Sequence, residues 1–111
     1  MIDLAGKRVL VTGSRGFLGR HVCDVLDSRG ATAPRIFGRK HCDLTNSAND
    51  DRLFSQWNPD IVIHLAAKCG GIGANMAAPA EFIFDNLMMG LNVIEATCKA
   101  GAKLVMVGSV C

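Results

Sequence analysis

The feature that most constrains this chain is a short apolar run that leads into glycines at three-residue spacing. The run, Val9 to Thr12, is rich in β-branched residues, which is typical of a buried parallel strand. Gly13, Gly16 and Gly19 follow it, and apolar residues then recur at helical spacing at Leu18, Val22, Val25 and Leu26. The sequence therefore predicts a strand over 8–12, a glycine loop, and a helix over about 17–29 that Gly30 ends.

A glycine loop between a strand and a helix can hold a phosphate group. The first glycine permits a tight turn, the second lets the backbone approach a pyrophosphate, and the third lets helix and strand pack closely. The helix N-terminus then faces the anion. We therefore predict that a dinucleotide binds to the loop residues Gly13, Ser14, Arg15, Gly16, Phe17, Leu18 and Gly19. No Gly-Lys-Ser/Thr ending follows, which excludes a Walker-type site.

The rest of the chain continues the alternation of strands and helices. We expect a weaker strand over 33–37 and a helix from Ser47, at capping spacing from Asp50, to Asn58-Pro59. A strand over 60–65, a loop over 66–78, a long helix from Pro79 to about Lys99 and a strand over 103–107 complete the pattern. This order predicts the α/β class, with a Rossmann-type doubly wound parallel sheet of about four strands. We interpret residues 1–111 as the N-terminal part of one such domain, without its substrate-binding region.

Positive residues indicate which dinucleotide binds. A site that prefers NAD offers Asp or Glu to the ribose about twenty residues after the loop, whereas this chain has Arg39 and Lys40 there. With Arg15, they can surround a 2′-phosphate, so we predict NADP. The alternative is that Arg39 and Lys40 form a solvated turn, which leaves the preference to Arg15 alone.

Composition excludes several other classes of protein. The net charge is +2 with no run of like charge, so we expect no nucleic-acid partner. No apolar stretch approaches the roughly twenty residues of a membrane span, so we expect no membrane partner. The five cysteines are an odd number at irregular spacings, which fits neither a disulfide framework nor a metal site and favours a cytoplasmic protein.

Four features of the chain occur together in register: TGSRGFLG, Asp43-Leu44, His64-Leu65-Ala66-Ala67 and Asn86. They resemble the extended branch of the short-chain dehydrogenase/reductase superfamily, which acts on nucleotide sugars. The resemblance implies cofactor contacts from Asp43, Leu44, Leu65, Ala66, Ala67 and Gly108. Asp43 can equally be a turn or cap residue, and we interpret His64 as a core histidine.

A narrower match covers 66–75, 79–83 and Gly108-Ser109-Val110-Cys111. These segments are similar to the GDP-L-fucose synthase family, which epimerises and reduces GDP-4-keto-6-deoxymannose with NADPH. The resemblance implies that Ser109 hydrogen-bonds the 4-keto oxygen and that Cys111 is the acid/base of epimerisation. Without these neighbours, Ser109 would be interpreted as a strand-end hydroxyl and Cys111 as an incidental residue.

The family's Tyr-x-x-x-Lys proton donor is absent, because the chain contains no tyrosine. We therefore expect the enzyme activity to belong to a longer parent protein and the 111-residue chain alone to be inactive. Two alternatives remain open. One is another nucleotide-sugar epimerase or dehydratase of the extended branch, and the other is a non-catalytic NADP-binding sensor.

The helix over 80–99 is apolar on nearly every side, so one sheet cannot bury all of it. In the superfamily the equivalent helix packs against its copy, which implies a homodimer with Met88 or Met89 near the axis. The alternative is burial by a further strand and helix. Either way, we expect the chain expressed alone to be poorly soluble.

Overall fold

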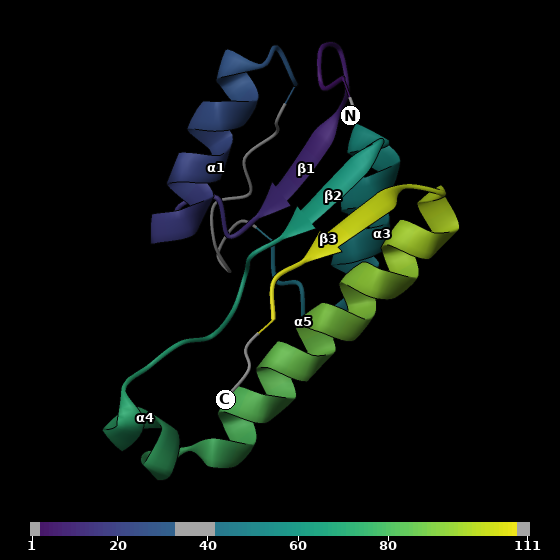
Figure 1. The fold of residues 1–111 in the computed structure, drawn as a ribbon. Coiled ribbons are helices and arrows are strands. Elements are labelled where there is room, and N and C mark those ends of the chain that lie inside the picture. The colour runs from purple at the N-terminus through teal and green to yellow at the C-terminus, as the bar shows by residue number, and fades with distance from the viewer. Residues whose placement is uncertain (1–2, 33–41, 109–111) are drawn as a thin grey trace.

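The computed structural model describes residues 3–32 and 42–108, which form a parallel sheet with helices on both faces (Figure 1). The strands are β1 (Val9–Thr12), β2 (Ile61–His64) and β3 (Lys103–Met106), and the sheet order is β1-β2-β3. The helices are α1 (Phe17–Ser28), α3 (Ser47–Trp57), α4 (Ile72–Ala77) and α5 (Pro79–Ala100). The predicted α/β class with a Rossmann-type parallel sheet is confirmed. The strand expected over 33–37 lies outside the described residues.

The side chains of the sheet alternate between two cores. On one face, Val9, Val11 and Ile61 pack with Cys23 and Leu26 of α1. On the other face, Leu10 and Val62 pack with Phe54 of α3 and with Val93 and Ala96 of α5. Both faces of β1 are therefore buried, which explains why its sequence is a continuous apolar run rather than an alternating one.

The register of the sheet brings three strand ends together. Thr12 of β1 lies opposite His64 of β2, and His64 lies opposite Met106 of β3. Because the strands are parallel, the loops after β1, β2 and β3 leave the sheet at the same edge. In a parallel sheet this carboxyl edge is where ligands bind.

Helix α3 begins at Ser47, as expected, but a different residue caps it. Its N-cap is Asn46, whose side chain accepts a hydrogen bond from the backbone N–H of Ala48 at 3.1 Å, so the capping role expected for Ser47 is wrong. Asn and Ser cap equally well, and the pattern alone does not separate adjacent candidates. The predicted end at Asn58-Pro59 is confirmed, with Asn58 in the left-handed conformation.

The segment 66–78 contains a helix that the sequence did not predict. Helix α4 (Ile72–Ala77) follows the long loop after β2 and lies away from the sheet, beside the start of α5 (Figure 1). It is one turn and a half long, and none of its residues is buried. Because it is short and none of its faces is buried, its sequence contains too few apolar residues at helical spacing to predict a helix.

Helix α5 (Pro79–Ala100) has one face in the core and one face in solvent. Val93 and Ala96 are buried against the sheet, whereas Ile83, Leu87, Leu91 and Ile94 are 61%, 56%, 59% and 45% exposed. The expected bounds, Pro79 at the start and Gly101 at the end, are confirmed. Despite its length and apolar composition, neither it nor another helix within 3–32 and 42–108 meets the requirements for crossing a membrane.

Asp50 of α3 is a buried carboxylate without a hydrogen-bond partner at either oxygen. Burial raises its pKa to about 7, and the neighbouring Asp51 adds to the increase. Below pH 7 the native state therefore keeps a proton that the unfolded state releases near pH 4, so the free energy of unfolding falls as the pH rises between these values.

We predict that Asp50→Asn removes this pH dependence. At pH 8 the variant should be more stable than the wild type by up to about 4 kcal/mol, because an amide needs no deprotonation, whereas at pH 4 the difference should be small. Urea unfolding across this range measures it, with the exposed Asp24→Asn as control. Parallel pH curves for wild type and Asp50→Asn would show that the carboxylate does not carry the effect.

Candidate functional site

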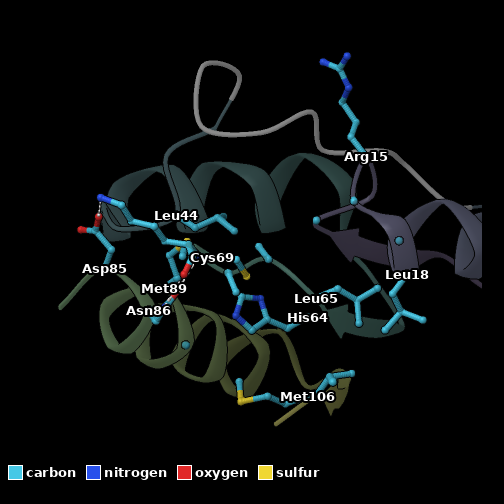
Figure 2. A pocket seen from close by; sticks show the side chains of 18 of the residues that line it. Arg15, Leu18, Leu44, His64, Leu65, Cys69, Asp85, Asn86, Met89 and Met106 are labelled. Carbon is cyan, nitrogen blue, oxygen red and sulfur yellow. Dashed lines mark hydrogen bonds and ion pairs between the residues drawn. The ribbon is translucent and has the colours of Figure 1, made fainter. Parts of the chain in front are cut away.

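A pocket of about 900 Å³ lies at the carboxyl edge of the sheet. The glycine loop forms one wall, the segment 42–45 a second, the segment 64–69 after β2 a third, and α5 and the end of β3 the remainder. Figure 2 shows Arg15 and Leu18 at one end of the pocket and Asp85 and Asn86 at the other. The pocket thus joins all three loops that leave the carboxyl edge.

Two of the loop glycines are required by close contacts. Gly13 has a φ of +72°, and a Cβ atom there would lie 2.7 Å from the backbone nitrogen of Ala66. A Cβ atom at Gly19 would collide with the carbonyl oxygen of Gly13. The loop therefore packs against both α1 and the turn after β2, and the spacing of these glycines follows from that packing.

The N-terminus of α1 is electrostatically suited to an anion. Its N-cap, Gly16, supplies no side-chain hydrogen bond, and no acidic residue stands in its first turn. The first N–H groups of the helix have no partners within it, and the helix dipole places positive potential there. The first N–H groups of α1 belong to the pocket wall, because Phe17, Leu18 and Gly19 line the pocket.

Thr12 and His64 form a buried hydrogen-bonded pair beneath the pocket. The distance from Thr12 Oγ1 to His64 Nδ1 is 2.7 Å, and the same hydroxyl oxygen accepts from the backbone N–H groups of Leu65 and Ala66, both at 3.1 Å. Burial lowers the pKa of His64. The interpretation of His64 as a core histidine is confirmed by its burial, but its ring also lines the pocket.

Asp43 is both a turn residue and a pocket residue. Its Oδ1 accepts from the backbone N–H of Thr45 at 3.0 Å and from Thr45 Oγ1 at 2.6 Å, which is an Asx turn. Asp43, Leu44 and Thr45 line the same wall of the pocket. The turn fixes this wall, so the two interpretations of Asp43 are compatible.

At the other end, Lys68 and Asn86 tie the loop after β2 to α5. Asn86 accepts from the backbone N–H of Lys68 at 2.6 Å and donates to its carbonyl oxygen at 3.1 Å. The ammonium of Lys68 pairs with Glu81 and, at 3.3 Å, with Asp85, and the hydrogen bond to Glu81 raises the pKa of Lys68. Two carboxylates therefore neutralise this lysine.

The structure brings nearly all described cofactor candidates to one pocket. Those that line it are Gly13, Arg15, Gly16, Phe17, Leu18, Gly19, Asp43, Leu44, Leu65, Ala66, Ala67 and Gly108. Ser14 is buried beneath the loop and does not line the pocket. Arg39, Ser109 and Cys111 lie outside the described residues.

Several pocket residues were not assigned to a binding site in the sequence analysis. They include Cys42, Thr45, His64, Lys68, Cys69, Asp85 and Met89. Burial raises the pKa of the Cys42 thiol, and the carboxylate of Asp50 raises it further. Position at the end of a strand could have indicated His64, and position just after it Lys68, whereas the roles of Asp85 and Met89 depend on how α5 packs. Within the described residues, no group of three or more His, Cys, Asp or Glu is arranged to hold a metal ion.

The model of the NAD dependent epimerase/dehydratase family matches residues 9–111. The chain belongs to this family. A GDP-L-fucose synthase of Sinorhizobium fredii is 38% identical over 112 aligned positions, which cover 100% of this chain and 35% of that protein. The chain therefore spans about a third of the length of this relative, and the sequence resemblance to GDP-L-fucose synthases is confirmed.

Solved structures of similar proteins superpose on this chain. A GDP-D-glycero-L-gluco-heptose synthase from Campylobacter jejuni, solved in the presence of NADPH, superposes with a TM-score of 0.88 at 28% identity and covers 99% of this chain and 32% of that one. A GDP-L-fucose synthetase from Naegleria fowleri bound to NADP gives 0.79 at 28% identity, over 100% of this chain and 36% of that one.

We predict opposite effects of alanine at two glycines. Gly19→Ala should lower the free energy of unfolding by about 1–3 kcal/mol, because the new methyl group meets rigid backbone. Gly90→Ala should raise it by about 0.5–1 kcal/mol, since this glycine lies inside α5 with open space at its Cβ position. Urea unfolding measures both, and a stable Gly19→Ala variant would contradict the packing described for the loop.

Proposed function

We propose that the whole protein is an NADPH-dependent enzyme that epimerises and reduces a GDP-linked 4-keto-6-deoxy sugar, as GDP-L-fucose synthases do. The observation that carries the proposal is the glycine loop at an uncapped helix N-terminus, in a pocket shared with the turn after β2. The names of the relatives supply the substrate class. Cys42, Cys69 and Cys98 form no disulfide within the described part of the chain, which supports a cytoplasmic location.

The residues of the pocket fit a dinucleotide. Gly13 and Gly19 let the loop pack directly against Ala66 and α1, so the backbone of the loop can form one wall of the pocket. Asp43 and Leu44 form the wall that would face the adenine. Leu65, Ala66 and Ala67 form the opposite wall. When bound, the reduced dinucleotide supplies hydride to the ketone.

Ser109 and Cys111 carry the chemistry on the sugar in this proposal. Ser109 donates a hydrogen bond to the 4-keto oxygen and so stabilises the charge that develops there. Cys111 exchanges a proton with the carbon beside the ketone on one face, for which a thiol with a pKa near neutrality is suited, and a histidine among further residues of the whole protein exchanges a proton on the opposite face. Gly108, which precedes them, lines the pocket and supports this placement.

The 111-residue chain alone should not complete the reaction, because it contains no tyrosine to donate the final proton. We propose that a Tyr-x-x-x-Lys pair and the sugar-binding region belong to further residues of the whole protein. Tyr-x-x-x-Lys in such residues supports the enzyme, and its absence supports the sensor. A cysteine two residues after Ser109 favours a fucose synthase over other epimerases of the branch.

The apolar stripe on α5, formed by Ile83, Leu87, Leu91 and Ile94, supports a homodimer. Met89 packs against the core, so a two-fold axis on the stripe would pass nearer to Leu87 and Leu91 than to Met89. Leu91→Glu should convert the dimer to a monomer in light scattering, whereas Asp24→Lys on α1 should not. If the Leu91→Glu variant is still a dimer, the dimer interface does not lie on this stripe.

For the cofactor, we predict that the whole protein binds NADPH at least about tenfold more tightly than NADH. Arg15→Ala and Arg39→Asp should narrow this ratio, because they remove positive charge from the 2′-phosphate, whereas Arg20→Ala on the outer face of α1 should leave it unchanged. Fluorescence titration with both dinucleotides measures the ratio. Equal affinities in the wild type would contradict the proposal for NADP.

For the chemistry, we predict that Cys111→Ser lowers solvent-deuterium incorporation at the sugar carbons by roughly a hundredfold, since a placed acid/base contributes at least that much. Its NADPH affinity should stay within about twofold of the wild type. Cys98→Ser, at an exposed thiol of α5, is the matched control. Unchanged incorporation in Cys111→Ser would refute the role of the thiol.

A further inference from the structure

The buried pair of Thr12 and His64 determines its own proton positions. A hydroxyl group has one proton to donate and two lone pairs that accept. The lone pairs of Thr12 Oγ1 face the N–H groups of Leu65 and Ala66, each at 3.1 Å. The remaining contact, at 2.7 Å, is to His64 Nδ1, so the hydroxyl proton is donated to that nitrogen.

It follows that His64 is neutral and carries its own proton on Nε2. A proton on Nδ1 would be a third donor aimed at an oxygen with two lone pairs, and it would leave the hydroxyl proton without an acceptor. The surroundings agree with this tautomer, because burial disfavours the charged imidazole. Figure 2 shows the ring near the centre of the view, with Leu65 to its right and Met106 below it.

The hydroxyl of Thr12 in turn holds a wall of the pocket. The N–H of Ala66 donates to Thr12 Oγ1, whereas the N–H of Leu65 is shared between Oγ1 and the carbonyl oxygen of Thr12, which is 3.2 Å away. Of these two N–H groups, that of Ala66 therefore has only the side-chain oxygen of Thr12 as its acceptor here. The backbone of Ala66 is also the surface on which Gly13 packs.

We infer that His64 is a positioning residue for the dinucleotide pocket: by accepting the proton of Thr12, it aims the hydroxyl lone pairs at Leu65 and Ala66 and so holds the turn after β2 against the glycine loop. The inference rests on the proposed dinucleotide binding, since it concerns the wall of that same pocket. It assigns a role to His64 that goes beyond filling the core.

The inference separates two side chains that would otherwise serve equally well. Asn at position 64 can place its Oδ1 near the position of Nδ1 and accept from Thr12, whereas Leu has a similar volume and no acceptor. If His64 only fills the core, Leu is the milder change. If His64 orients the hydroxyl of Thr12, Asn is the milder change.

The test uses NADPH titration of the whole protein with His64→Asn, His64→Leu and Thr12→Val. We expect His64→Leu and Thr12→Val each to weaken NADPH binding about tenfold, because each leaves a buried polar group without its partner. His64→Asn should stay within about threefold of the wild type. The double variant of Thr12→Val and His64→Leu should be no weaker than Thr12→Val alone, because both changes break one chain of hydrogen bonds.

Two measurements on the protein itself accompany the titration. Nitrogen NMR of ¹⁵N-histidine-labelled wild type should show Nδ1 of His64 without a proton and Nε2 with one. Amide hydrogen exchange at Ala66 should be faster in His64→Leu than in the wild type and His64→Asn. These readouts do not require NADPH and apply even where a variant binds none.

Three results would overturn the inference: a protonated Nδ1, equal losses in His64→Asn and His64→Leu, or additive losses in the double variant. Failure of the proposed function gives a different result, since the wild type would then bind no NADPH while the NMR tautomer is still observed. If His64→Leu does not fold, the tautomer in the wild type and the affinity of His64→Asn against Thr12→Val decide the matter.

Discussion

The pocket depends on the contact between two backbone turns that only a glycine permits. Gly13 brings the end of β1 to within a few ångströms of Ala66, and Gly19 of α1 packs closely against the carbonyl oxygen of Gly13. The hydroxyl of Thr12 hydrogen-bonds across the same junction. These contacts fix the distance between the glycine loop and the turn after β2, which sets the width of the pocket at the carboxyl edge. The wall at the end of β3 is held next to this junction because β3 pairs with β2 in the sheet.

The two ends of the pocket differ in charge, and the difference decides which end suits an anion. At the α1 end the helix dipole is not opposed by an acidic residue in the first turn. At the α5 end the ammonium of Lys68 faces both Glu81 and Asp85. A count of positive residues would make Lys68 a phosphate ligand, but its pairing removes it from that role. We therefore propose that the dinucleotide phosphates bind at α1.

The sequence was most informative where local rules act alone. The β-branched run, the glycine spacing and Gly30 together predicted β1, the loop and α1, because each signal lies within a few residues of what it determines. The N-cap of α3 is Asn46 and not the expected Ser47, because Asn and Ser stabilise a helix N-terminus by similar free energies. Helix α4 was missed because it buries no face. The role of His64 needed the parallel register that places it opposite Thr12, which is a contact between residues far apart in the chain.

Binding of the dinucleotide pyrophosphate at the N-terminus of α1 can be tested by a crystal structure of the whole protein with NADPH. We expect pyrophosphate oxygens within hydrogen-bond distance of the backbone N–H groups of Phe17 and Leu18, with Ala66 still bonded to Thr12 Oγ1. Phosphates bound at Lys68, or outside the pocket between the glycine loop and the turn after β2, would contradict it.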